Sequence, residues 1–232
     1  MFYFDKIYDK KILKSDFTDN AFFTTREICI CDKTKNQNFE IENNIKNLEK
    51  YLERELISPQ QTHSANIDIA IPSRIEYPNT DSLILTNKTQ AIFLNFADCT
   101  PIILYDKKQN IGAIAHAGWR GTEAKISQKT ALKLINEFNS KPQDITAIIG
   151  PAICGNCYEV GEEVYLKFYT EIPNNNNLKL DLKEINKQQL IQLGIEKIDI
   201  CPYCTCCDNQ YFFSYRKENG TTLRHSAVLK LK

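Results

Sequence analysis

The 232-residue sequence has no excess of charge of either sign, no long apolar run and no internal repeat. Lysine plus arginine number 29 and so do aspartate plus glutamate, which argues against a surface built for nucleic acid or anionic lipid. No window approaches the roughly 20 apolar residues of a membrane helix, and the N-terminal segment lacks the apolar core of a signal peptide. We therefore expect a cytoplasmic protein that acts on a small molecule, with no membrane or nucleic-acid partner.

The composition fits an α/β protein. Hydrophobic residues make up 42% of the chain and charged residues 25%, as in ordinary globular domains. Short apolar runs typical of strands alternate with segments of helical periodicity. We expect strands at 91–96, 101–106, 111–117, 145–150 and 195–200, and helices at 40–57, from 121 through 135, from 161 onward and at 182–193.

This alternation predicts a single α/β domain over residues 1–232, with a central mixed β-sheet flanked by helices. The runs 101–106 and 111–117 are separated by a short polar turn, which favours an antiparallel hairpin within that sheet. The polar PNNNN turn at 173–177 is too short to separate two domains.

Histidine is scarce, with three in the chain, so the surroundings of each are informative. His63 follows a predicted helix and a proline-containing turn, and His116 ends an apolar run. Cys99 lies between two predicted strands. Two imidazoles and a thiolate suit Zn²⁺ and leave one coordination position for the water of a catalytic site. Because the spacing matches no standard signature, hydrogen-bonded core histidines and a small buried thiol remain the alternative.

The nine cysteines are expected to be thiols or metal ligands rather than a disulfide framework. Six of them lie in the C-terminal half: Cys154, Cys157, Cys201, Cys204, Cys206 and Cys207. ICGNC and CPYC form two C-x₂-C pairs, which suggest a zinc ribbon by spacing alone, although the segment between the pairs is longer than usual. CPYC also suggests a redox motif, but an aromatic, strand-like run follows it. We interpret the six as reduced thiols, with a second metal site as the alternative.

Arginine and aromatic residues gather at Trp119-Arg120 and in a C-terminal set consisting of Phe212, Phe213, Tyr215, Arg216 and Arg224. Arginine offers a planar fork for phosphate or carboxylate, and the helix start after Arg120 offers backbone N–H groups to an anion. Aromatic faces stack on planar bases. Core packing is the alternative for Phe212 and Tyr215, and Glu159 either supplies a carboxylate or caps the helix that follows it.

In chain order, six segments of this sequence resemble the YfiH family, also called the laccase-like multicopper polyphenol oxidoreductase family, the purine nucleoside phosphorylase YfiH family or peptidoglycan editing factors. The segments are QTHS, TDSLILT, FADCTPIILYD, AIAHAGWRGT, IGPAICGNCYEVGEEV and FFSYRKENGTTLR. They run from about residue 55 to the C-terminus, and the first 50 residues match the family only loosely.

The resemblance implies a single α/β domain with a central mixed sheet and zinc held by His63, Cys99 and His116. It implies activities of two kinds: phosphorolysis of adenosine, inosine, guanosine and S-methyl-5′-thioadenosine, and hydrolytic deamination of adenosine to inosine. Beyond the three metal ligands, which also count as catalytic, the resemblance implies Arg120 as a catalytic residue and Arg120, Arg216 and Arg224 as binding residues for nucleoside and phosphate. We add Tyr215 to the binding residues because its aromatic face can stack on a base.

The sequence departs from the family pattern at two places, and other functions remain possible interpretations of the same residues. The Gly-Arg pair usual near the family's C-terminus is Leu223-Arg224 here, and CPYCTCC is richer in cysteine than the family pattern. An amidase that removes a misincorporated amino acid from a cell-wall precursor would use the same zinc chemistry and remains an alternative function. A copper-dependent polyphenol oxidase is disfavoured, since three histidines cannot furnish several copper centres. A binding protein that has no bound metal is the non-enzymatic alternative.

Overall fold

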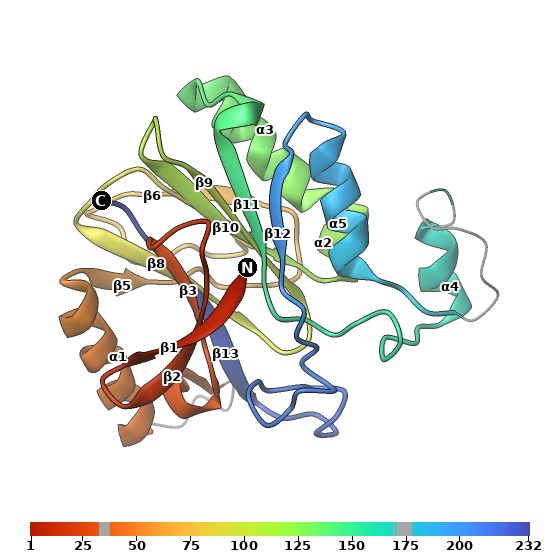
Figure 1. Ribbon diagram of the computed structural model, residues 1–232, viewed down its shortest axis with the longest axis horizontal. Helices are drawn as coiled ribbons and strands as arrows, with labels where there is room; N and C mark the ends of the chain where they lie inside the picture. The colour runs from red at the N-terminus through yellow and green to blue at the C-terminus, as the bar shows by residue number, and fades with distance from the viewer. Residues whose placement is uncertain (33–37, 169, 171–177) are drawn as a thin grey trace.

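The computed structural model describes residues 1–32, 38–168, 170 and 178–232. Within these ranges the strands form two mixed sheets that pack against each other, with helices on their outer faces (Figure 1). The predicted α/β class with mixed strand pairing is confirmed, but the strands divide between two sheets instead of forming one central sheet. The predicted turn at 173–177 lies outside the described residues.

Sheet 1 has the strand order β1-β2-β3-β13-β8-β5, and β4 also pairs with β13. Its pairs are antiparallel except for β5 beside β8. The strands are β1 (Phe2–Ile7), β2 (Lys10–Ser15), β3 (Ala21–Thr24), β4 (Cys31–Asp32), β5 (Glu55–Ile57), β8 (Gln90–Phe96) and β13 (Leu223–Lys230).

Sheet 2 has the order β12-β11-β9-β10-β7-β6. The outer pairs β11–β12 and β6–β7 are parallel, and the central pairs are antiparallel. The strands are β6 (Ile67–Ala70), β7 (Ser82–Leu85), β9 (Thr100–Asp106), β10 (Ile111–Ala117), β11 (Ile145–Ile149) and β12 (Lys197–Ile200). The β9–β10 pair confirms the predicted hairpin.

Side-chain alternation along the central strands explains the stacking of the sheets. In β8, Ile92, Leu94 and Phe96 enter the core between the sheets, whereas Ala91 and Phe93 pack on the opposite side, toward helix α1. Strands β9 and β10 alternate in the same way between the inter-sheet core and the helices beyond sheet 2. A strand that is apolar on both faces therefore serves two cores at once.

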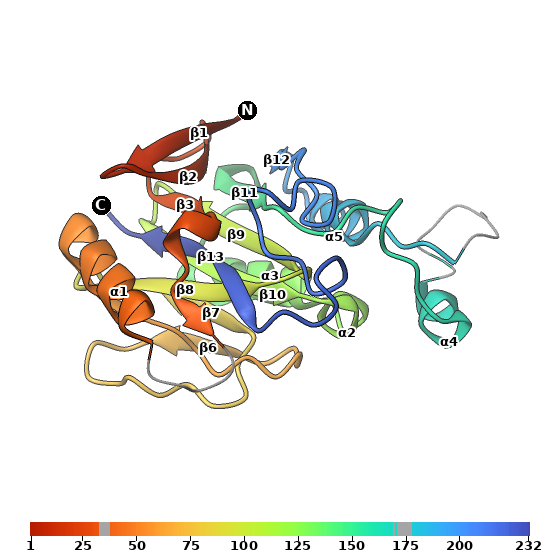
Figure 2. The same ribbon diagram turned by 90° about the horizontal axis from the view of Figure 1, so that it is seen from below.

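The helices complete a four-layer arrangement of helix, sheet, sheet and helix. Helix α1 (Phe39–Leu52) covers sheet 1, while α3 (Ile126–Phe138) and α5 (Leu182–Ile191) cover sheet 2 (Figures 1 and 2). The shorter helices are α2 (Trp119–Glu123), α4 (Glu162–Tyr165) and the 3₁₀ turns η1 (Arg26–Ile28), η2 (Pro142–Asp144) and η3 (Leu166–Phe168). Among the described residues, no helix combines the length and apolar character needed to cross a membrane.

Two of the predicted helices differ in extent from the observed ones. The helix expected over 40–57 ends at Leu52 because Glu53 adopts a left-handed backbone with φ 56°, and β5 follows it. The helix expected from 121 through 135 is divided between α2 and α3 by Lys125, which is also left-handed with φ 59°. Apolar periodicity continues through both breaks and therefore conceals them.

Gly112 of β10 lies in close contact with a side chain of sheet 1. A Cβ there would lie 2.8 Å from Leu229 Cδ2 of sheet 1 and 2.9 Å from the Leu104 carbonyl oxygen. We expect Gly112→Ala to lower the free energy of unfolding by about 1–3 kcal/mol, as overpacking of a core does. Thermal denaturation measures this as a fall in Tm of roughly 2–4 °C per kcal/mol for a chain of this length.

Gly161→Ala is the matched control, because the atoms nearest to its new Cβ belong to the flexible end of the Glu163 side chain. An unchanged Tm in Gly112→Ala would contradict the close approach of the sheets at this strand.

Candidate active site

The three predicted metal ligands come together where the chain passes between the sheets. His63 lies in the connection from β5 of sheet 1 to β6 of sheet 2, and Cys99 lies in the connection from β8 to β9. His116 is the penultimate residue of β10. Two crossovers and a strand end therefore meet at one edge of the inter-sheet core.

The ligand atoms of His63, Cys99 and His116 all lie within 4.8 Å of one another. The two imidazole centroids are 4.9 Å apart, and the His116 ring also packs against Phe96 at 5.4 Å. Gly118 leaves the space that the group needs, because a Cβ there would lie 2.8 Å from Cys99 Sγ. Two nitrogens and one sulfur at this separation fit a single zinc ion with one open position.

Asp81, which sequence reasoning did not assign, holds this group in place. Its buried carboxylate accepts hydrogen bonds from the backbone N–H groups of Thr62 (3.1 Å), His63 (3.1 Å) and Ser64 (2.7 Å) and from the Ser64 hydroxyl (2.7 Å). His63, whose backbone is left-handed at φ 62°, is thereby fixed by its neighbours.

The same carboxylate fixes the second imidazole. His116 Nδ1 lies 2.8 Å from Asp81 Oδ1, and the His116 backbone N–H donates to the Asp81 carbonyl at 2.7 Å. Because β7 pairs with β10, with Ser82 opposite Ala115, Asp81 lies directly across from His116. An imidazole that donates its Nδ1–H to a carboxylate presents Nε2 to a metal. A carboxylate is the usual outer partner of a histidine ligand.

The charges in this group stabilise one another. Burial alone raises the pKa of the Cys99 thiol, but the charge and hydrogen bonds of His116 and His63 lower it to about 6. Burial alone lowers the pKa of His116, but Cys99 and Asp81 raise it to about 9. Burial likewise raises the pKa of the Asp81 carboxyl, and hydrogen bonds from His116 and Ser64 outweigh it and bring the pKa below its usual range. A thiolate is the form of cysteine that binds metal.

A cavity of about 590 Å³ opens on the group, within the size range of small-molecule sites. Its lining includes all three predicted ligands together with Tyr215, Arg216 and Arg224. Arg120 does not line it: this exposed side chain lies over the Trp119 ring, 4.2 Å from the centroid. A more open depression adjoins the cavity and shares Trp119, Tyr158 and Arg216 with it.

Arginine and tyrosine side chains form one wall of the cavity. Arg216 donates to the Glu159 carbonyl at 2.9 Å and lies 5.5 Å from the Tyr158 ring centroid. Arg224 donates to the carbonyls of Thr221 and Leu223 at 2.6 and 2.8 Å. Burial first, and then the charge of nearby Cys99, raises the pKa of Tyr158 to about 12, so its hydroxyl stays protonated at neutral pH.

Two further lining residues, Asn95 and Asp98, were missed from the sequence. Asn95 Oδ1 accepts from the Ser226 hydroxyl at 2.7 Å, which leaves the amide nitrogen as its remaining polar side-chain atom. Asp98 accepts from Thr205 Oγ1 at 2.6 Å and from the Arg216 backbone N–H at 2.8 Å. The sequence feature that could have identified them is a polar residue in or beside an otherwise apolar strand: Asn95 lies inside β8, and Asp98 follows it.

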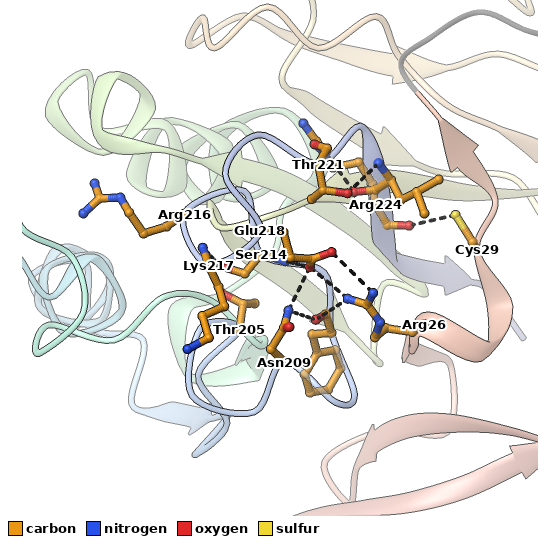
Figure 3. A network of polar contacts seen from close by, with 12 residues as sticks. Arg26, Cys29, Thr205, Asn209, Ser214, Arg216, Lys217, Glu218, Thr221 and Arg224 are labelled. Atoms are coloured by element: carbon orange, nitrogen blue, oxygen red, sulfur yellow. Dashed lines mark hydrogen bonds and ion pairs between the residues drawn. The ribbon is translucent and has the colours of Figure 1, made fainter.

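A network of charged and polar side chains anchors the loop that carries Arg216 (Figure 3). The Glu218 carboxylate accepts from Arg26 at 2.8 and 3.3 Å, from Asn209 Nδ2 at 2.8 Å and from the Ser214 backbone N–H at 2.9 Å. In Figure 3 the Arg216 side chain points away from this network. The loop is thus anchored on one side and presents Arg216 on the other.

The structure also gives the positions of Phe212, Tyr215, His225 and Glu159. Phe212 is fully buried, as the core alternative expected, whereas Tyr215 is 55% exposed. His225 is buried between the Phe96 and Phe212 rings, and burial lowers its pKa to about 3. Helix α4 has Gly161 at its N-cap without a side-chain hydrogen bond, so Glu159 does not cap it.

Both the sequence and the fold of the chain are similar to those of known proteins. Residues 24–232 match the family model described as multi-copper polyphenol oxidoreductase laccase. The chain belongs to this family. The predicted resemblance to the laccase-like family is therefore confirmed.

Individual relatives carry more specific names. The purine nucleoside phosphorylase YlmD of Bacillus subtilis (strain 168) is 34% identical over 164 residues, which cover 66% of this chain and 59% of that protein. An adenosine deaminase from an unknown prokaryotic organism is 30% identical, with 70% of each chain covered. The crystal structure of YlmD from Geobacillus stearothermophilus superposes with a TM-score of 0.88 at 26% identity, covering 99% of this chain and 98% of that one.

We expect Asp81→Asn to weaken metal binding at the three-ligand group. The amide keeps the shape of the carboxylate but removes its charge and one of its acceptor oxygens, so the loop at 62–64 and the His116 ring are less firmly held. Loss of such an outer partner typically costs 10–100-fold in metal affinity. Competition titration of the metal-free protein with a chromophoric chelator measures the Kd for zinc.

Ser64→Ala is the control, because it removes one donor and leaves the pairing of Asp81 with His116 intact. An Asp81→Asn affinity equal to that of the unaltered chain would show that the carboxylate does not orient the ligands.

The lowered pKa of Cys99 predicts a pH profile. In metal-free protein, alkylation of Cys99 by iodoacetamide should rise through a midpoint near pH 6, because the thiolate exists above that pH. Peptide mass spectrometry follows each cysteine separately. His116→Ala should move the midpoint upward toward the value of an ordinary thiol, and Cys201, whose pKa burial raises to about 12, should stay unreacted over the same range. A midpoint above pH 8 in the unaltered chain would contradict the stabilised thiolate.

Proposed function

We propose that this chain is a zinc-dependent purine nucleoside enzyme. In this proposal it catalyses phosphorolysis of adenosine, inosine, guanosine and S-methyl-5′-thioadenosine, and it deaminates adenosine to inosine. The observation that carries the proposal is the His63, Cys99 and His116 group at the wall of a cavity that also contains arginine and aromatic side chains. Relatives named for each of the two activities support it.

The donor set favours zinc in an open site. One thiolate and two imidazoles, with Asp81 behind one imidazole, make a three-ligand set of the catalytic kind. When bound, zinc supplies Lewis acidity, which activates water or polarises an electronegative atom of the substrate at neutral pH. Copper oxidation of phenols is disfavoured because the only histidine besides the two ligands, His225, is buried among aromatic rings of the core.

The cavity wall offers groups for both halves of a nucleoside. The exposed ring of Tyr215 and the indole of Trp119 are faces on which a purine can stack. Arg216 supplies a positive charge for phosphate, and Arg120 supplies a second one just outside the lining. Asn95 and the protonated Tyr158 hydroxyl are hydrogen-bond donors for the base or the ribose.

These roles match the bonds that change. In phosphorolysis, a phosphate oxygen bonds to ribose C1′ while the C1′–N bond breaks, and the base leaves with a proton. In deamination, a water oxygen bonds to C6 of adenine and the amino group leaves as ammonia. Holding the phosphate or the water beside the reacting carbon is the contribution expected of Arg216 and of the hydrogen-bond donors.

The proposal also covers the whole chain as one catalytic domain over residues 1–232. A cytoplasmic location is part of it, because a reducing compartment suits nine cysteines that form no disulfide among the described residues.

A nucleoside panel, assayed with and without phosphate by chromatography of the products, tests the proposal. We expect adenine, hypoxanthine or guanine to be released only when phosphate is present, and inosine to form from adenosine without it. His63→Ala and Cys99→Ala should each lower kcat/KM at least about 100-fold, since even outer partners of metal ligands affect activity 10–100-fold.

Arg216→Ala should raise the KM for phosphate, whereas Lys217→Ala, a neighbouring cation that does not line the cavity, should leave it unchanged. Full turnover by His63→Ala or Cys99→Ala protein would refute the role of the metal. Base release without phosphate would refute phosphorolysis.

A further inference from the structure

Four cysteines that the proposed reaction does not use converge in a second group. The sulfur atoms of Cys154, Cys157, Cys204 and Cys207 all lie within 4.8 Å of one another. The first two follow β11, and the last two lie between β12 and β13. The group therefore joins two C-x₂-C segments that are distant in the sequence.

The pairing differs from the one that motif spacing suggested. CPYC pairs Cys201 with Cys204, but the structure places Cys204 with Cys207 and leaves Cys201 fully buried outside the group. Cys206 lies within the second segment and is also outside the group. Two C-x₂-C spacings overlap in CPYCTCC, so the sequence alone does not show that Cys204 and Cys207 are the pair that joins the group.

Backbone N–H groups point at the sulfur of Cys204. The Cys154 N–H donates to this sulfur at 3.2 Å and the Cys207 N–H at 3.5 Å. These two hydrogen bonds fix the position of the Cys204 sulfur between the two segments. In the first segment, Cys157 N–H donates to the Cys154 carbonyl at 3.0 Å, which closes a tight turn that brings the two sulfurs to the same side.

The two segments are also joined independently of their sulfurs. Ala152 forms a parallel bridge with Cys204, and the Thr205 N–H donates to the Ala152 carbonyl at 3.2 Å. The Asp208 carboxylate accepts from the Cys204 N–H at 2.8 Å, and the Asp208 N–H donates to the Cys204 carbonyl at 2.7 Å. The sulfurs are thus held together by backbone structure.

The separations fit one ion. Zinc–sulfur bonds of about 2.3 Å give a tetrahedron whose edges are about 3.8 Å, and Cys157 Sγ lies 3.4 Å from Cys207 Sγ. A disulfide needs about 2.05 Å, and an iron–sulfur cluster inserts several atoms between its thiolates and spreads them further apart. Four thiolates without an open position are the ligand set of a structural zinc site.

We propose that Cys154, Cys157, Cys204 and Cys207 bind one zinc ion as a closed structural site, separate from the three-ligand group in the cavity. The site holds together one segment that borders the cavity through Ile153 and Tyr158 and a second segment that contacts the lining residue Asp98. Arg216 contacts the carbonyls of Cys157 and Glu159 at 3.5 and 2.9 Å, and Thr205 donates to Asp98 at 2.6 Å. Zinc at the four cysteines therefore fixes the wall that presents Arg216.

Metal analysis of the full-length chain, purified under reducing conditions without chelator, tests this site. We expect about two zinc ions per chain, and one fewer in Cys157→Ser and in Cys207→Ser. Cys206→Ser is the matched control, because it changes a cysteine of the same segment that lies outside the group, and it should retain both ions.

A His63→Ala/His116→Ala double variant isolates the second site and does not depend on the folding of the cysteine variants. It should keep one zinc, and X-ray absorption should find four sulfur neighbours at about 2.3 Å. Replacement by Co²⁺ should give the visible bands of a tetrahedral thiolate site.

A folded double variant without metal would overturn the proposal, and so would a Cys157–Cys207 disulfide in protein alkylated at lysis. Neither result bears on the three-ligand group, so the outcome is independent of the proposed reaction.

Discussion

The hydrogen bonds of the buried Asp81 carboxylate are the interaction on which the site depends. Removing a carboxylate from water costs free energy that only several donors together offset. At Asp81 these donors come from two separate places, the loop at 62–64 and the end of β10. The carboxylate is stable only when both are in position, so the arrangement of His63 and His116 forms together with the fold. A metal that arrives later finds ligands already oriented.

The division of the strands into two sheets determines where those ligands meet. Strands β5 and β8 run parallel beside each other in sheet 1, and the chain crosses to sheet 2 after each of them. The crossovers carry His63 and Cys99 to the rim of the inter-sheet core, beside the apolar ring of Phe96. The low polarity on the Phe96 side strengthens the attraction between the Cys99 thiolate and the imidazoles.

Much of the fold could be predicted where a strand is buried on both faces. The runs at 91–96, 101–106 and 111–117 are apolar except for Asn95, Asp106 and His116, and the observed strands differ from them by a residue at most. Strands β1 and β2 were missed because they form an edge hairpin rich in lysine, without the apolar run that identifies a buried strand. Strand β13 was missed although it lies at the centre of sheet 1, since its arginine and histidine mask its apolar residues. Pairing of the strands into two sheets depends on contacts between distant residues, which periodicity does not encode.

At both cysteine-containing sites, spacing in the sequence is not enough to identify the metal ligands. For Cys99, the chemistry of a thiol beside two histidines suggested a metal ligand, but the spacing fits no standard pattern, and the order of the family segments decided between a ligand and a small buried thiol. For CPYCTCC, spacing offers two overlapping pairs, and the choice between them is made by tertiary structure: the N–H of Cys154 bonds to the sulfur of Cys204, and Asp208 fixes the turn that brings Cys207 to the same side. An open three-ligand set held by a carboxylate and a closed four-thiolate set held by backbone are different solutions to the same requirement. Each brings its ligands together before the ion binds, and the segment between Cys204 and Arg216 connects the second site to the wall of the first.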